Sequence, residues 1–233
     1  DLLAALALSD SEPVAFDYLG RVKLKAGDVA GAVESLKRAT ELAPNDDDTF
    51  FQLALALERA GQIADAFKAL DQAVQLAPAR IDAKQKLAEM TQAQGRFAEA
   101  IALYKKVLAE HPDTASLHVA IGTCEAERDK HADAITAFRK ALSIDPALKG
   151  VQAKLGSSLE RLDKLDDAAK AFEAAVKEEP VEPASYRSLG YIYKGKGKKK
   201  DAIRSFEKYL ELRPDAPDVE EVKDQLVYLR EPR

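Results

Sequence analysis

The side chains with the greatest chemical reactivity in this chain are one cysteine and three histidines: Cys124, His111, His118 and His131. A cysteine nucleophile needs a histidine and an acid to activate it, and the sequence around Cys124 does not show that spacing. Cysteine and histidine do not cluster as in a zinc site, and there is neither a glycine-rich phosphate loop nor a nucleophile elbow. The sequence therefore predicts a protein that is not an enzyme and that holds no cofactor or metal.

A dense run of positive charge is the second chemical feature, formed by Lys194, Lys196, Lys198, Lys199 and Lys200. One interpretation is a solvated loop between two helices. The other starts from three lysines at the beginning of a helix, which oppose the helix dipole. An acidic partner held by this patch would offset that unfavourable placement. The sequence leaves both interpretations open.

Composition narrows the class of protein. The chain has 233 residues, 46% of them hydrophobic and 32% charged, and a formal net charge of -5, which does not favour nucleic acid or an anionic membrane as a partner. The longest apolar run, Leu2 to Leu8, is too short to span a bilayer and follows an acidic residue, so we expect neither a membrane helix nor a signal peptide. Because the chain begins at Asp1, we expect a mature form or an excised fragment. The compartment stays open, cytoplasmic or periplasmic, and the alanine-rich, asparagine-poor composition indicates a bacterial source.

A pattern of apolar, small and aromatic residues recurs along nearly the whole chain at intervals of 34 residues. Its clearest copy reads Tyr186-x2-Leu189-Gly190-x2-Tyr193, then Ala202-x3-Phe206, then Pro214. The alanine recurs at Ala32, Ala66, Ala100, Ala134, Ala168 and Ala202, and the proline at Pro44, Pro78, Pro112, Pro146, Pro180 and Pro214. These residue types at this spacing resemble the tetratricopeptide repeat (TPR), a helix–turn–helix unit.

The resemblance implies an all-α fold, a right-handed superhelical solenoid in which each helix pair packs on the next. The six repeats are expected at residues 13–46, 47–80, 81–114, 115–148, 149–182 and 183–216. Residues 1–12 match the end of the second helix of a preceding repeat. Residues 217–233 are expected to form a capping helix and tail, with Val222 and Leu226 on its apolar stripe and Asp215 or Asp218 as its cap.

Small residues are expected where the two helices of a repeat approach each other. They are Gly20, Ala54, Ala88, Gly122, Gly156 and Gly190, and we expect them to face the recurring alanines. The turn between the helices needs a left-handed residue, which we expect to be glycine in four repeats and Asp129 or Asp163 in the other two. The prolines are expected to end the second helices, because proline cannot continue the hydrogen-bond ladder.

The junction of repeats 3 and 4 departs from the pattern. Polar or charged residues take places that are apolar or aromatic in most other repeats, namely Lys84, Thr91, Glu110, His118 and Glu125. Less apolar surface can be buried there, so we expect the weakest interface between repeats and a point of flexion at this junction. Because His118 and His131 occupy aromatic positions and Cys124 an inner one, we expect packing roles for all three.

The resemblance also implies a binding surface, because TPR arrays often hold an extended peptide or a partner helix in a concave groove lined by the first helix of each repeat. Among the matching positions we expect partner contacts from Arg21, Phe51, Leu55, Val119, Arg187 and Tyr191. Aromatic and arginine side chains are the usual anchors of interfaces, although single exposed apolar residues also occur on any surface. The Lys/Asn/Asn/Lys/Arg clamp of the chaperone-binding branch is absent, since the chain has one asparagine, Asn45.

Three functions remain open from the sequence. The first is a non-catalytic protein–protein interaction scaffold that binds a peptide or partner helix in the groove. The second is an assembly or pilot subunit of a bacterial secretion, pilus or envelope complex, with self-association through an open N-terminal edge that carries Leu2, Leu3 and Leu6. The third is the recruiting arm of a larger enzyme. We expect a protein partner, no nucleic acid and no direct membrane insertion.

Overall fold

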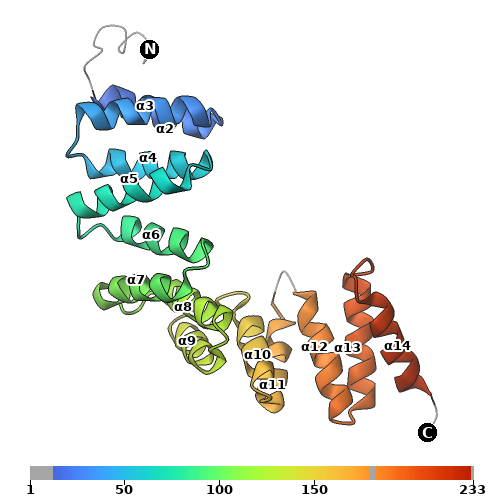
Figure 1. The fold of residues 1–233 in the computed structure, drawn as a ribbon. Helices are drawn as coiled ribbons and strands as arrows, with labels where there is room; N and C mark the ends of the chain where they lie inside the picture. The colour runs from blue at the N-terminus through green and yellow to red at the C-terminus, as the bar shows by residue number, and fades with distance from the viewer. Residues whose placement is uncertain (1–12, 179–181, 232–233) are drawn as a thin grey trace. The chain divides into compact units, whose positions relative to one another are not determined.

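The structure is a computed structural model that describes residues 13–178 and 182–231 (Figure 1). The regular elements in these two ranges are all α-helices. The prediction of a helix remnant at residues 1–12 lies outside the described residues.

The chain divides into two compact units, Asp1–Glu110 and His111–Arg233. The first unit contains α2 (Pro13–Ala26), α3 (Val29–Leu42), α4 (Asp47–Arg59), α5 (Ile63–Leu76), α6 (Ile81–Ala93) and α7 (Phe97–Glu110). The second contains α8 (Ala115–Glu127), α9 (His131–Ile144), α10 (Val151–Arg161), α11 (Leu165–Ala175), α12 (Pro183–Gly195), α13 (Lys199–Leu212) and α14 (Val219–Arg230). Within each unit the helices pack in consecutive pairs and each pair packs on the next, which confirms the predicted all-α repeat fold (Figure 1).

Each turn inside a helix pair contains one residue with positive φ. Four of these residues are glycines, at positions 27, 61, 95 and 197, as the sequence predicts. Asp129 and Asp163 take their places in the other two pairs, with φ of 60° and 56°. Aspartate adopts this conformation more readily than most side chains, so the substitution keeps the turn.

The glycines of the first helices make room for a large side chain of the second helix. A Cβ at Gly156 would lie 2.8 Å from the ring of Phe172, and a Cβ at Gly190 would lie 2.4 Å from the ring of Phe206. The predicted close approach is present: a Cβ at Gly20 would lie 3.2 Å from the carbonyl oxygen of the recurring Ala32, although the nearest atom, at 2.4 Å, belongs to Leu36. The facing residue is the apolar one a helical turn beyond the alanine, because its side chain crosses the gap between the helices.

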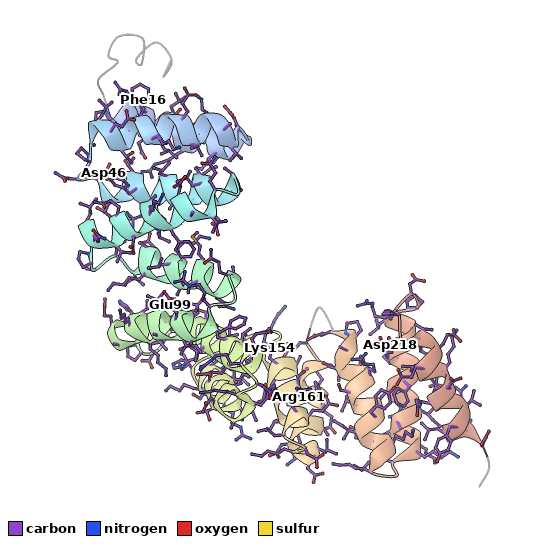
Figure 2. All side chains as sticks on the ribbon, in the orientation of Figure 1. Phe16, Asp46, Glu99, Lys154, Arg161 and Asp218 are labelled. Carbon is purple, nitrogen blue, oxygen red and sulfur yellow. The ribbon has the colours of Figure 1, made fainter. Side chains whose placement is uncertain are left out.

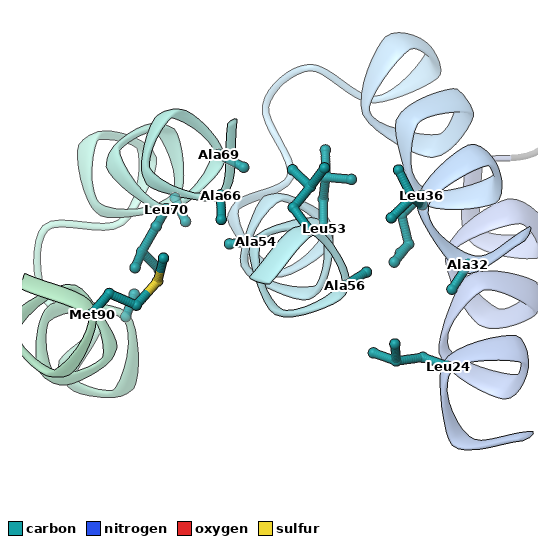
Figure 3. Close-up of a cluster of buried hydrophobic side chains, with 14 residues drawn as sticks. Leu24, Ala32, Leu36, Leu53, Ala54, Ala56, Ala66, Ala69, Leu70 and Met90 are labelled. Atoms are coloured by element: carbon teal, nitrogen blue, oxygen red, sulfur yellow. The ribbon is translucent and has the colours of Figure 1, made fainter. Parts of the chain in front are cut away.

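The core of the first unit is a continuous apolar cluster that runs from α2 to α6 (Figure 3). Leu36, Leu70 and Met90 are buried in it. Ala54 of α4 faces Ala66 and Leu70 of α5, so a small residue sits where these two helices meet (Figure 3). Each helix pair thus completes its core with side chains from the next pair, which is why consecutive packing is required.

The second unit ends with α14, which packs on α13. Val222, Leu226 and Leu229 of α14 are buried against Phe206 and Tyr209 of α13. The aromatic Tyr209 replaces the alanine that this position has in most repeats, and it fills the space in front of α14.

Two helix starts differ from expectation. Asp218 precedes α14 but does not cap it, because its carboxylate accepts hydrogen bonds from Tyr209 and Arg187 instead. Helix α10 begins at Val151, two residues after the expected repeat start at Lys149. Gly150 takes φ of 74° there and donates its N–H to the Glu178 carboxylate at 2.6 Å.

The polar residues that interrupt the pattern in repeats 3 and 4 have local partners. Thr91 donates its hydroxyl to the carbonyl of Leu87 at 2.7 Å, and Glu125 pairs with Arg128 at 2.9 Å. The chain divides into its two units between Glu110 and His111, the junction where the sequence predicts the weakest interface. Flexion there stays a prediction.

Candidate functional site

One predicted groove residue of the first unit, Arg21, belongs to a network of ion pairs. Arg21 contacts Asp17 at 2.7 Å and also pairs with Asp48 of the next repeat. Arg80, at the start of α6, contacts Asp48 at 2.6 Å and Asp47 at 2.8 Å. Hydrogen bonds from Arg21 and Arg80 oppose the desolvation of Asp48 and leave its pKa below the usual value.

Phe51 is covered on one face by this network. The Arg80 guanidinium lies 4.5 Å from the centre of the Phe51 ring, a cation–π contact, and the Arg80 side chain is only 16% exposed. Leu55, one turn further along α4, is half-buried against the first-unit core. Val119 of α8 is likewise half-buried against the core of the second unit. These apolar residues therefore support the fold, and partner contact by them stays a proposal.

Arg187 and Tyr191 of α12 are engaged by α14. Arg187 pairs with Asp218, and the Tyr191 hydroxyl donates to Glu221 at 2.7 Å. Tyr191 also packs edge-on against Phe206 with ring centres 5.0 Å apart. Burial and the Glu221 contact raise the pKa of Tyr191 to about 12. Both side chains thus serve the contact with α14, which sequence reasoning did not anticipate.

Most of the lysine run is also used inside the fold. Lys196 pairs with Asp166, and Lys199 donates to the carbonyl of Glu231 at 3.2 Å. Lys194 contacts Gln225 and lies 5.0 Å from the Tyr228 ring, while Lys198 lies 5.6 Å from the Tyr193 ring. Lys200 makes no hydrogen bond or ion pair with the described residues. Binding of an acidic partner by this run remains a proposal, for which Lys200 is the lysine without a hydrogen bond or ion pair to the described residues.

Charged groove positions pair from one repeat to the next at a fixed register. Glu58 of α4 contacts Lys86 of α6 at 2.7 Å, and the equivalent Glu160 of α10 accepts a hydrogen bond from Ser188 of α12 at 3.1 Å. Between them in the sequence the same register holds two further pairs, Gln92 with Ala120 and Ala126 with Lys154, and only the second keeps the lysine. Because Ala126 has no carboxylate, Lys154 lacks the acid that Lys86 has, and it makes no ion pair with any residue that the structure describes.

A pocket of about 280 Å³ is present at this position, between α8, α9 and α10. Both Lys154 and Arg161 are carried by α10 (Figure 2). The lining includes Thr123, Ala126, His131, Phe138, Ala153, Lys154, Ser157 and Arg161. Phe138 and Ala153 supply a buried apolar base, whereas Lys154 and Ser157 are exposed. Thr123 and Ser157 stand at the same groove position of the repeat as Arg21, Leu55 and Tyr191, and Ala153 stands at that of Phe51 and Val119.

His131 borders the pocket in a polar cluster with Asp129 and Arg161. Its Nε2 lies 3.1 Å from Asp129 and 3.4 Å from the Arg161 Nε, and it can donate to the first or accept from the second. The nearer contact favours donation to Asp129, which leaves Nδ1 as a buried acceptor without a partner among the described residues. Hydrogen bonds from Arg161 and His131 lower the pKa of Asp129.

Cys124 is fully buried and free. Burial and the negative charge of Glu125 raise the pKa of its thiol to about 11, so the reactive thiolate is scarce at neutral pH. Across the described ranges, no cluster of His, Cys, Asp and Glu could hold a metal ion. The helices in the same ranges include none with the length and apolarity needed to cross a membrane.

Sequence reasoning did not single out Lys154, Arg161 or Arg80. A signal for Lys154 was available, because the repeat register aligns Ala126 with Glu58 and Glu160. The residue that precedes the first helix is acidic or neutral in the other repeats, and Arg80 is the exception. Its position over Phe51, however, depends on the conformation of its side chain.

Family models match most of the chain. A model described as the Cytochrome c-type biogenesis protein H TPR domain matches residues 4–117. A tetratricopeptide repeat model matches residues 91–148 and 153–217, more than half of the chain. No curated protein matches the sequence.

Solved structures share the fold at low identity. The C-terminal part of a TPR repeat-containing protein from Cytophaga hutchinsonii is 15% identical, with a TM-score of 0.82 over 97% of this chain and 92% of that chain. PilW, described as a widely conserved type IV pilus biogenesis factor, is 17% identical, with a TM-score of 0.71 over 91% of this chain and 98% of that chain. YrrB, described as a TPR protein with an unusual peptide-binding site, is 19% identical, with a TM-score of 0.68 over 82% of this chain and 99% of that chain. With its recurrent pattern, consecutive helix pairs and family-model matches, the chain belongs to the tetratricopeptide repeat family.

Proposed function

We propose that this protein is a non-catalytic interaction scaffold that binds a segment of a partner protein on the first helices of its second unit. The observation that carries the proposal is the pocket between α8, α9 and α10. It combines an apolar base at Phe138 with exposed polar groups, a combination typical of ligand sites.

Two further points support this location. The pocket coincides with groove positions, at Thr123 and Ser157, that the family resemblance marks as partner-facing. In contrast, the groove residues Arg21, Arg187 and Tyr191 are held by neighbouring helices. YrrB, a protein of the same fold, is described as having a peptide-binding site.

The proposal is tested by selecting peptides that bind the full chain from a displayed library of random short peptides. Affinities of the selected peptides are then measured for wild type and for Ser157→Tyr, which places a ring in the pocket. We expect Ser157→Tyr to weaken binding at least about tenfold, because the ring excludes the ligand from a site that it fills.

Thr136→Tyr is the matched control. Thr136 of α9 is exposed and donates its hydroxyl to the carbonyl four residues earlier at 3.1 Å, as Ser157 does at 3.1 Å, but it lies outside the pocket. Equal affinities of wild type and Ser157→Tyr, or a failure to select any peptide, would contradict the proposal.

A second candidate is an assembly subunit that acts by self-association. The structure exposes a stripe on α2, with Val14 74%, Tyr18 53% and Val22 43% exposed. Residues at the Val22 position of later repeats, such as Met90 and Ile192, are buried in clusters with the preceding helix pair. PilW, of the same fold, is described as a pilus biogenesis factor.

Sedimentation equilibrium over a range of protein concentrations tests this candidate. Self-association through the α2 stripe predicts a mass that rises with concentration in the wild type and stays at that of the monomer in Val22→Lys. Val227→Lys on α14, where Val227 is 61% exposed, should behave as the wild type. A constant wild-type mass would remove the candidate.

A further inference from the structure

We propose that the pocket beside Lys154 takes a single acidic side chain of the partner, whose carboxylate pairs with the Lys154 ammonium in the place left by a missing glutamate. This inference rests on the proposed function and specifies the chemistry of the segment that is bound. It comes from comparing one position across repeats of the same chain.

In two places, residues at equivalent repeat positions join one first helix to the next. Glu58 and Lys86 form an ion pair of 2.7 Å between α4 and α6, and Glu160 accepts from Ser188 at 3.1 Å between α10 and α12. The intervening helices α8 and α10 place Ala126 and Lys154 at these positions. At this position Lys154 keeps the positive charge that Lys86 has, but Ala126 supplies no carboxylate.

The absence of the acid creates space as well as unpaired charge. Ala126 and Lys154 both line the pocket of about 280 Å³. At the other two positions the glutamate side chain spans the gap between successive first helices. A carboxylate that enters beside Ala126 therefore finds a lysine with no competing ion pair among the described residues.

The charges around the pocket limit the number of carboxylates that it can bind. Arg161 is already paired with Asp129 at 3.2 Å. Glu127 and Glu182 also line the pocket, and their charges repel a second carboxylate. The site thus fits one acidic residue flanked by neutral or basic residues, and a run of acids is disfavoured.

The experiment starts from the displayed library of random short peptides selected on the full chain. Selected peptides are resynthesised with each Asp or Glu changed to its amide, and affinities are measured for wild type, Lys154→Met and Ala126→Glu. We expect selected peptides to share one acidic position, and its amide form to bind roughly three- to tenfold more weakly, because a charge-assisted contact is lost.

The two protein variants, Lys154→Met and Ala126→Glu, test the same contact from the side of the protein. Lys154→Met should weaken the acidic peptide by the same factor and leave the amide peptide unchanged. Ala126→Glu should weaken both peptides, because its side chain takes the place of the ligand as Glu58 does opposite Lys86. The control Lys86→Met removes an equivalent lysine that already has an internal partner, and it should leave both affinities unchanged.

The outcomes separate this inference from the proposed function. If peptides bind and Ser157→Tyr weakens them, but neither amide substitution nor Lys154→Met changes affinity, the pocket binds partners and the acidic specificity is overturned. If no peptide binds, or Ser157→Tyr has no effect, the proposed function itself fails. When Lys154→Met is measured with the amide peptide, the loss of affinity should be no greater than for either change alone. This result, together with the two single losses, supports direct pairing between Lys154 and the acidic side chain.

Discussion

At the scale of single residues, identical side chains in this protein differ in role because of the residue placed opposite them. Lys86 and Lys154 occupy the same repeat position, yet Lys86 pairs with Glu58, whereas Ala126 stands at the position equivalent to Glu58 for Lys154. The first lysine joins two helices, and the second makes no ion pair with the described residues. The same reasoning applies to Arg187, whose partner Asp218 immediately precedes α14.

Cys124 is expected to resist alkylation in the folded protein. Its thiol is fully buried and its pKa is raised to about 11, so at pH 8 the thiolate is rarer than for an ordinary cysteine. Mass spectrometry after iodoacetamide treatment should show an unmodified thiol in the native protein and complete modification in denaturant. Rapid modification of the native protein would show that Cys124 is accessible.

The glycines that face a large side chain are expected to be intolerant of alanine. In Gly156→Ala the new Cβ would lie 2.8 Å from the Phe172 ring, so we expect a loss of about 1–3 kcal/mol in the free energy of unfolding. The control is Gly195→Ala near the end of α12, where no neighbouring atom lies within 4 Å and alanine should stabilise by up to about 1 kcal/mol. Urea denaturation measures both, and equal stabilities of the two variants would contradict the packing argument.

At the scale of elements, α14 joins the second unit through one apolar face. Val222 is fully buried against the α13 side, whereas Val227 on the same helix is 61% exposed. Glu221 of α14, and Asp218 just before it, bind Tyr191 and Arg187 of α12. The helix therefore covers both the apolar end of the unit and two side chains that a groove would otherwise expose.

Val222→Asp is expected to detach α14 and to destabilise the second unit by roughly 3 kcal/mol or more, because it buries an unpaired carboxyl group. Val227→Asp, on the exposed face of the same helix, should change stability by less than about 0.5 kcal/mol. Chemical denaturation followed by circular dichroism measures the two. A small effect of Val222→Asp would mean that α14 contributes little to the unit.

At the scale of the whole molecule, the chain divides into two compact units between Glu110 and His111. The polar residues near this boundary have partners within their own unit, since Lys84 pairs with Glu110 at 2.6 Å and Glu125 pairs with Arg128 at 2.9 Å. Local ion pairs of this kind contribute little stability compared with buried apolar surface.

Hydrogen exchange is expected to be faster across residues 81–130 than in the helices on either side. The physical reason is that local opening needs less free energy where less apolar surface is buried. Mass spectrometry of peptic fragments measures the protection of each helix. Uniform protection from α4 to α11 would contradict a weak junction.

The sequence by itself determined the features that repeat locally. Alternation of apolar, small and proline residues was enough to predict the helix pairs, and the need for positive φ was enough to place glycine or Asp129 and Asp163 in the turns. These features depend on residues within one helical hairpin, so a periodic pattern reveals them. The same logic located the polar junction of repeats 3 and 4.

Only the tertiary structure decided which groove residues are free. Arg80 over Phe51, Tyr191 with Glu221, and Arg187 with Asp218 are contacts between side chains from different parts of the repeat array. Their contacts depend on how long flexible side chains cross from one repeat to the next, and no periodicity in the sequence encodes that path. The fold was therefore readable from the sequence, whereas the location that we propose for partner binding follows from which side chains pair inside the fold.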